Sequence, residues 1–150
     1  MNFKHLILKA TIIVIVSVLC GLIYNSVSES GIALIHESLN LKSGSYLTIE
    51  QTKMLLNDGR TLFIDTRYKN EFEKGHLKNA KNISPDTNRE DIMAFIETIP
   101  KDQQIVVYCS SSACNSSRRF ASFLIYLGYK NVYAYLGGYR EWKMKQYPVE

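Results

Sequence analysis

The sequence lacks the features that mark two common classes of protein. Its 150 residues include only three cysteines, and an odd number of cysteines does not form a disulfide scaffold. One of them, Cys20, lies inside an apolar segment. Basic residues are scattered among acidic ones, and a formal net charge of +4 is too small for a nucleic-acid-binding surface. The sequence therefore argues against a disulfide-rich secreted domain and against a nucleic-acid partner.

Apolar residues, by contrast, are present in the amount that a folded domain needs. Hydrophobic residues make up 46% of the chain and charged residues 21%, which is the balance of a globular protein rather than a disordered one. A chain of 150 residues has room for one domain of ordinary size and a short appendage. We therefore expect one fold and one functional site.

The first 24 residues contain no acidic residue. Residues 6–24 are mostly apolar, with Lys4 before them and Lys9 among them, which predicts a membrane-spanning helix or a signal peptide. Because the only small-x-small site that follows, at residues 26–28, is poor, we favour an uncleaved anchor. The two lysines would hold the N-terminus inside. The expected location is the bacterial inner membrane, with the domain facing the periplasm or exterior; secretion into the periplasm after cleavage is the alternative.

Strands and helices alternate in the remainder of the chain. A capping box formed by Thr48 and Gln51 predicts the start of a helix that ends near Gly59. Apolar stripes with helical spacing indicate further helices that end at Pro100 and at Gly128, and a last helix near the C-terminus. Short apolar runs predict buried strands at residues 61–65, 105–108 and 131–135.

This alternation is typical of an α/β fold in which a parallel sheet is covered on both faces by helices. The chain is thereby divided into a signal anchor or signal peptide at residues 1–24, a linker at residues 25–45 and one domain at residues 46–150. In folds of this class, functional sites form where the carboxyl ends of strands lead into loops. Two segments take that position: Asp65-Thr66-Arg67 after the first predicted strand, and Cys109 after the second.

Cys109 precedes a loop of small residues and a helix that we expect to begin near Arg118. Such a loop lets successive backbone N–H groups point at one spot, and the helix adds its positive end. Both effects stabilise a thiolate, which is the nucleophilic form of cysteine. Arg118 is near enough in sequence to add positive potential. The loop residues are Ser110, Ser111, Ser112, Ala113, Cys114, Asn115 and Ser116.

Several separated segments resemble rhodanese-like domains, and together they extend from about Tyr46 to Val149. The resemblance implies a three-layer fold with a central parallel sheet flanked by helices. It also implies a sulfurtransferase, in which a cysteine takes up a sulfane sulfur as a persulfide and passes it on. The segments are Leu62–Arg67, Glu71-Phe72, Gly75–Leu77, Ala80–Ile83, Val106–Cys109, Gly128–Val132, and Gly137-Gly138 through Trp142 to Val149.

The resemblance makes Cys109 the catalytic nucleophile and the backbone from Ser110 to Ser116 the substrate cradle. Asp65 and Arg67 match the Asp-x-Arg of the family, which organises the site. The implied partners are a small sulfur donor, namely thiosulfate, a polysulfide or a persulfide, and a thiol or protein acceptor. No cofactor is expected, and no metal, because His76 with two cysteines is not a recognisable zinc ligand set.

The loop departs from the family pattern in two ways. It is about two residues longer than a common rhodanese loop and has no Arg between Cys109 and Ser117, which removes a side chain that would help to hold thiosulfate. Asn115 stands where a related phosphatase would need Arg, so the sequence also weakens a phosphatase function.

The second cysteine of the loop leaves several functions open. Cys114 could form a reversible disulfide with Cys109, resolve or protect a persulfide, act as the acceptor, or have no chemical role. Two alternatives to a sulfurtransferase follow. One is a non-catalytic interaction module that keeps the rhodanese fold, and the other is a thiol-disulfide redox protein that uses both cysteines.

Overall fold

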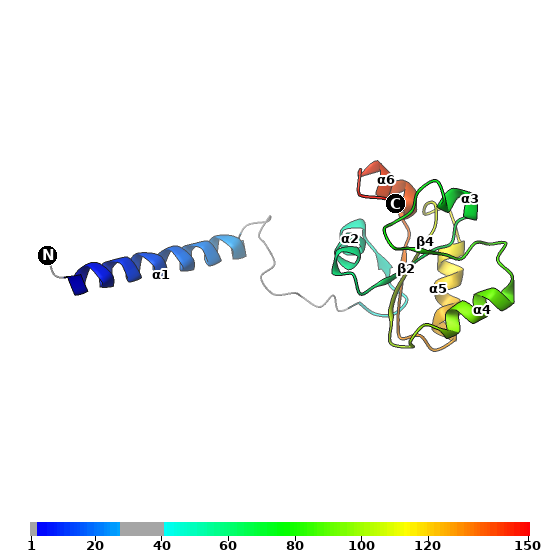
Figure 1. Ribbon diagram of the computed structural model, residues 1–150, viewed down its shortest axis with the longest axis horizontal. Coiled ribbons are helices and arrows are strands. Elements are labelled where there is room, and N and C mark those ends of the chain that lie inside the picture. The colour runs from blue at the N-terminus through cyan, green and yellow to red at the C-terminus, as the bar shows by residue number, and fades with distance from the viewer. Residues whose placement is uncertain (1–2, 28–40) are drawn as a thin grey trace. The chain divides into compact units, whose positions relative to one another are not determined.

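The structure is a computed structural model that describes residues 3–27 and 41–150. The chain forms two compact units, Met1–Asn40 and Leu41–Glu150. Helix α1, Phe3–Val27, belongs to the first unit, and the strands of the described residues lie in the second (Figure 1). Each unit is considered by itself.

Helix α1 corrects one expectation from the sequence. The apolar segment is helical, but no helix in the described part of the chain is long and apolar enough to cross a membrane. Lys9 interrupts the segment, and the run from Ala10 to Tyr24 is shorter than the roughly 20 residues that a bilayer requires. The predicted membrane-spanning helix is therefore not found among the described residues, and a membrane partner through it stays a prediction. The location of the protein stays a prediction.

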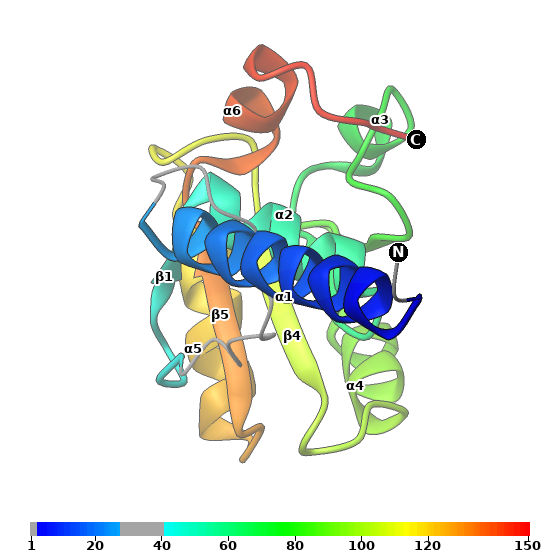
Figure 2. The same ribbon diagram turned by 90° about the vertical axis from the view of Figure 1, so that its left-hand side faces the viewer.

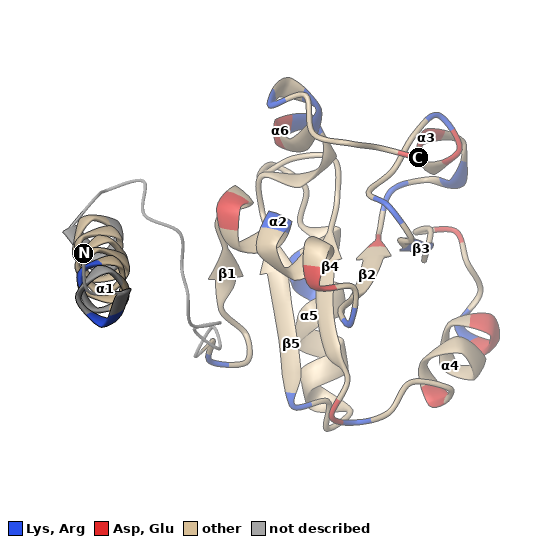
Figure 3. Cartoon of the chain, turned by 60° about the vertical axis from the view of Figure 1, so that its left-hand side comes forward, with Lys and Arg blue, Asp and Glu red and all other residues tan. Residues whose placement is uncertain are grey.

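The second unit is built on a five-stranded parallel sheet with the order β1-β5-β4-β2-β3. Strand β4 lies at its centre, between β5 and β2, as Figure 3 shows. Its residue Val107 is in register with Ile64 on one side and with Ala134 on the other. The strands are β1 (Tyr46–Leu47), β2 (Leu62–Asp65), β3 (Lys81–Asn82), β4 (Gln104–Tyr108) and β5 (Asn131–Tyr135).

Helices cover both faces of this sheet and produce the expected three-layer α/β arrangement. Helix α2 lies on one face, and α4 and α5 lie on the other (Figures 1 and 2). All connections between paired strands are crossovers, as parallel pairing requires. The helices of this unit are α2 (Ile49–Asp58), α3 (Lys69–Phe72), α4 (Arg89–Glu97), α5 (Ser116–Tyr126) and α6 (Gly138–Met144).

Local signals explain where α2 begins and ends. The Thr48 hydroxyl accepts a hydrogen bond from the Gln51 amide, and the Gln51 side chain accepts one from the Thr48 amide. Gly59 ends the helix with φ 72°, a left-handed conformation that glycine adopts without strain. The capping box and the stop predicted from the sequence are both confirmed.

The core on the α4 and α5 face is apolar and fully buried. Ile105 and Val107 of β4 belong to this cluster, together with Ile96 of α4 and Leu124 of α5. Burying a side chain of this size stabilises the fold by about 1.5–3 kcal/mol. Val106, the strand residue between them, points to the opposite face and is also buried.

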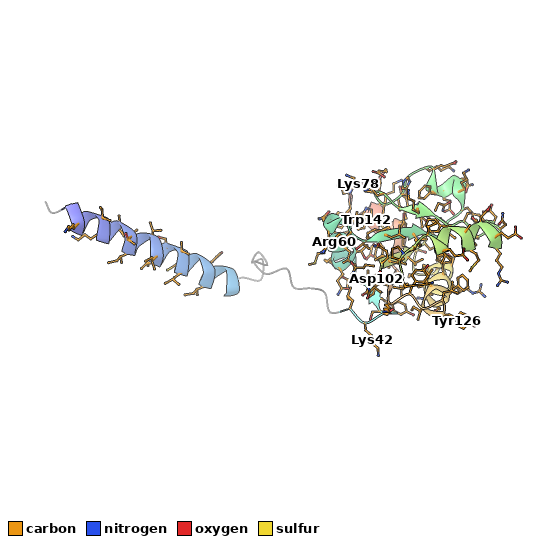
Figure 4. All side chains as sticks on the ribbon, turned by 60° about the horizontal axis from the view of Figure 1, so that its bottom comes forward. Lys42, Arg60, Lys78, Asp102, Tyr126 and Trp142 are labelled. Atoms are coloured by element: carbon orange, nitrogen blue, oxygen red, sulfur yellow. A yellow bond between two sulfur atoms is a disulfide. The ribbon has the colours of Figure 1, made fainter. Side chains whose placement is uncertain are left out.

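Helix α6 is anchored to the domain by Trp142, which is labelled in Figure 4 and has no exposed surface. Its ring packs edge-on against Tyr135, with the centroids 6.4 Å apart, and its Nε1–H donates to the carbonyl of Pro148 at 2.9 Å. The last helix is thereby held at the carboxyl end of β5.

Candidate functional site

The site lies at the carboxyl ends of the neighbouring strands β2 and β4. Asp65 and Tyr108, the last residues of these strands, are in register. The next residue, Thr66, donates both its amide and its hydroxyl to the Tyr108 carbonyl, each at 2.9 Å. Thr66 therefore lies beside Cys109, the residue that follows Tyr108.

Cys109 and Cys114 are joined by a disulfide, with their Cα atoms 6.2 Å apart. Cys109 is only 4% exposed, whereas Cys114 is partly exposed. Among the described residues, Cys20 is the free cysteine. The two cysteines of the loop thus meet, and their bond closes the loop between β4 and α5.

The hydroxyl of Ser116 contacts both sulfur atoms. Its Oγ lies 3.2 Å from Cys109 Sγ and 3.0 Å from Cys114 Sγ. It also lies 2.8 Å from Thr66 Oγ1. Because the Thr66 hydroxyl donates to the Tyr108 carbonyl, the Ser116 proton goes to Thr66 Oγ1, to the Thr66 carbonyl at 3.4 Å or to a sulfur atom. A donor that can turn toward sulfur stabilises a thiolate when the disulfide is open.

Helix α6 fixes the start of the loop through backbone hydrogen bonds. The amide of Tyr139 donates to the Cys109 carbonyl, and the amide of Arg140 to the Ser110 carbonyl, each at 2.9 Å. Gly138 makes this approach possible. It has φ 65°, and a Cβ atom there would lie 2.4 Å from the Cys109 carbonyl oxygen.

Asp65 and Arg67 form a buried ion pair with each other and are not among the residues that contact the sulfur atoms. Arg67 Nη2 lies 2.6 Å from Asp65 Oδ2, and the two side chains are 4% and 0% exposed. Arg67 also donates to the Gly75 carbonyl at 2.7 Å, and its guanidinium lies 4.0 Å from the Tyr139 ring centroid. Burial disfavours the charged guanidinium, but the hydrogen bonds and charge of Asp65 outweigh it and raise the pKa of Arg67. The pair therefore ties the end of β2 to α6.

Arg118 lies in the first turn of α5, which begins at Ser116, close to the start that was expected near Arg118. Its guanidinium donates to Asn115 Oδ1 at 2.9 Å and faces the ring of Tyr46 at 5.7 Å. Its Nε is a buried nitrogen that has no hydrogen-bond partner within the described residues. A role for Arg118 in supporting Cys109 stays a prediction.

The remaining loop residues differ in exposure. Ser110 Oγ lies 3.7 Å from Cys109 Sγ, and the Cys114 amide donates to the Ser111 carbonyl at 3.0 Å. This turn takes the Cys114 amide out of the predicted cradle of N–H groups. Ser112, Ala113 and Asn115 are exposed.

Sequence reasoning missed the side chains of Thr66 and Ser116. Ser116 was expected to contribute backbone only, and Thr66 was only the middle residue of the Asp-x-Arg segment. Both contact the cysteines or their immediate neighbour because β2 and β4 are adjacent and in register. Position at the end of adjacent strands was the one signal that could have identified Thr66.

With this geometry in view, the comparisons with known proteins identify the family. The sequence profile described as "Rhodanese-like domain" matches residues 48–145. The chain belongs to this family. The tRNA uridine(34) hydroxylase of Photorhabdus laumondii is 36% identical over 106 residues, covering 69% of this chain and 30% of that protein. The protein of the same name from Yersinia pestis is 33% identical over 104 residues, covering 68% and 29%.

The rhodanese-like chain thus spans less than a third of the length of these curated relatives. Among solved structures, the BH2092 protein from Bacillus halodurans superposes with a TM-score of 0.60 at 25% identity, covering 70% of this chain and 76% of that one. Human single-domain sulfurtransferase TSTD1 superposes with a TM-score of 0.54 at 22% identity, covering 67% of this chain and 96% of that one. Thiosulfate sulfurtransferase from Pseudomonas aeruginosa gives 0.57 at 19% identity, covering 71% and 20%. The last two likenesses concern the fold alone.

Proposed function

We propose that this rhodanese-like domain is a sulfurtransferase or persulfide carrier that uses Cys109 as its nucleophile. The observation that carries the proposal is the placement of Cys109 Sγ at the end of the central strand, 3.2 Å from the Ser116 hydroxyl. A thiolate formed there by reduction of the disulfide has a hydrogen-bond donor ready to stabilise it.

The proposed reaction has two transfers. The Cys109 thiolate attacks the outer sulfur of a persulfide or polysulfide donor, a sulfur–sulfur bond forms on Cys109, and the donor leaves as its thiolate. An acceptor thiolate then attacks the outer sulfur of the Cys109 persulfide, takes that sulfur, and restores the Cys109 thiolate. Neither step needs a cofactor.

The surroundings of the loop favour a persulfide or polysulfide over thiosulfate as the donor. No Arg lies between Cys109 and Ser117, and the guanidinium of Arg118 is hydrogen-bonded to Asn115. Thiosulfate carries two negative charges, which are best held by such a side chain. Acidic and basic residues are mixed over the rhodanese-like domain (Figure 3), which favours a small donor and a thiol or protein acceptor over a nucleic acid.

The test measures sulfur on the protein. We expect reduced full-length protein to gain one sulfur atom on Cys109 after treatment with a polysulfide, as detected by intact-mass and peptide analysis, and to produce thiocyanate when cyanide is the acceptor. Cys109→Ser should abolish both signals, whereas Cys20→Ser should retain them. Full activity in Cys109→Ser would contradict the proposal.

A second candidate function, a thiol-disulfide redox protein, is favoured by the disulfide itself. Such a protein would exchange electrons with dithiol partners without ever gaining sulfur. A non-catalytic interaction module would neither gain sulfur nor cycle its disulfide. The mass measurement after donor treatment separates both from a sulfur carrier.

A further inference from the structure

We infer that Cys114 resolves the Cys109 persulfide within the loop, so that the domain releases its sulfur as hydrogen sulfide and is left as the Cys109–Cys114 disulfide. A dithiol reductant then reopens the disulfide for the next cycle. This inference rests on the proposed function, and it assigns to Cys114 a role that a simple carrier does not need.

The bonded pair has the geometry of the product of that step. In a Cys109 persulfide, the inner sulfur is Cys109 Sγ, and the disulfide shows that Cys114 Sγ reaches this atom within the folded domain. Their Cα atoms are 6.2 Å apart, inside the range that a disulfide spans. Attack by Cys114 on the inner sulfur therefore requires no unfolding of the sheet or of α5.

The step is balanced in atoms and electrons. The Cys114 thiolate attacks Cys109 Sγ, a bond forms between the two Sγ atoms, and the bond from Cys109 Sγ to the outer sulfur breaks. The outer sulfur leaves as sulfide and takes the proton that Cys114 has lost. The sulfane sulfur is thereby reduced to sulfide and the Cys114 sulfur is oxidised, whereas Cys109 Sγ keeps the oxidation state that it had in the persulfide.

Ser116 is positioned for both partners of this attack. Its hydroxyl lies 3.0 Å from Cys114 Sγ and 3.2 Å from Cys109 Sγ, so one donor can turn between the attacking sulfur and the sulfur that is attacked. Thr66 Oγ1, 2.8 Å from Ser116 Oγ, holds this hydroxyl near the carboxyl ends of β2 and β4.

The difference in exposure decides how the disulfide is reopened. Cys109 is 4% exposed, whereas Cys114 is partly exposed and follows the exposed residues Ser112 and Ala113. An incoming thiolate therefore reaches Cys114 Sγ first and forms a mixed disulfide there, and Cys109 leaves as the thiolate. The second thiol of the reductant then releases Cys114, and the reductant is oxidised to its own disulfide. Each cycle regenerates the nucleophile at the buried position.

A single-turnover experiment tests the inference on the full-length chain. Reduced protein is mixed with one equivalent of glutathione persulfide, excess reductant having been removed. Released sulfide is measured by alkylation, and the state of the protein by intact mass. We expect wild-type protein to lose two hydrogens and to release sulfide. Cys114→Ser, and Cys114→Ala as a second variant, should keep the added sulfur and release no more sulfide than the donor alone. Cys20→Ser is the matched control and should behave as wild type.

The possible failures can be told apart. If Cys114→Ser gains sulfur but wild-type protein holds its own persulfide equally long, the inference is overturned while the proposed function stands. If neither Cys114 variant gains sulfur although both fold, as checked by circular dichroism, the proposed function fails and the inference fails with it. Trapping of a monothiol reductant on Cys109 rather than Cys114 would overturn the assigned order of reopening.

Discussion

The ends of strands β2 and β4 lie side by side, yet the residues that follow them make different kinds of interaction. After β2, Asp65 and Arg67 form a buried ion pair whose hydrogen bonds are satisfied by each other and by Gly75. After β4, Cys109 and Cys114 form a covalent bond that thiols can break, in a loop with exposed residues. One strand end is a fixed support and the other holds the reactive atoms. A reactive cysteine thus depends on an inert neighbour to keep its loop in place.

The largest expected effect comes from breaking the support. Arg67→Met leaves the carboxylate of Asp65 buried without its partner, so we expect the free energy of unfolding to fall by about 3–5 kcal/mol. Chemical denaturation measures this loss. The control is Arg60→Met, which removes the exposed partner of Asp58 and should change the free energy of unfolding far less, because water screens this pair. If both variants lost the same free energy of unfolding, the buried pair would be no more important for stability than the exposed one.

A smaller effect is expected where α6 meets the reactive loop. Gly138→Ala combines a left-handed backbone with a Cβ atom only 2.4 Å from the Cys109 carbonyl oxygen. We expect the free energy of unfolding to fall by about 1–3 kcal/mol. We also expect thiocyanate production to fall even under conditions in which the variant stays folded, because the clash lies at Cys109.

Gly59→Ala is the matched control for this variant. Gly59 has φ 72°, but no atom lies within 4 Å of its Cβ position. The control therefore carries the backbone strain without the clash and should keep its activity. Loss of activity in both glycine variants would show that stability alone is responsible.

The hydroxyl at the sulfur atoms should affect rate more than stability. Ser116→Ala removes the donor that lies 3.2 Å from Cys109 Sγ, a hydrogen bond worth about 1 kcal/mol. We expect persulfide formation on Cys109 to slow by about five- to tenfold, measured by rapid quench and mass spectrometry. Ser112→Ala, at an exposed position of the same loop, should leave the rate unchanged. An equal rate in the two variants would remove Ser116 from the proposed mechanism.

The smallest effect is expected at Arg118. Its guanidinium is hydrogen-bonded to Asn115 and faces Tyr46, so Arg118→Gln should change the rate with a polysulfide donor by no more than about twofold, or about 0.4 kcal/mol. Steady-state thiocyanate production measures this. A large loss with thiosulfate alone would instead show that Arg118 turns inward to hold the anion.

The parts of the fold that local chemistry specifies could be predicted from the sequence. Thr48 and Gly59 gave the limits of α2, and the apolar run at residues 131–135 gave β5. Strands β1 and β3 and helix α3 were not predicted, because elements of two to four residues show no period. The apolar N-terminal segment was predicted to be a membrane-spanning helix or a signal peptide, and no helix of the described residues is long and apolar enough to span a membrane.

The position of Cys109 at the end of β4 could be predicted, because a short apolar run before it indicates a buried strand. The residues around its sulfur atom could not be predicted. The contact between Thr66 and Ser116 joins residues 50 positions apart. It depends on the register of β2 with β4 and on a helix that starts at Ser116, neither of which a single sequence encodes locally.

The attachment of the loop to α6 has a consequence for synthesis of the chain. Both amides that hold the Cys109 and Ser110 carbonyls come from Tyr139 and Arg140, close to the C-terminus. Both cysteines are therefore synthesised before the residues that fix the start of their loop. The hydrogen bonds to the two carbonyls can form only after helix α6 has been made.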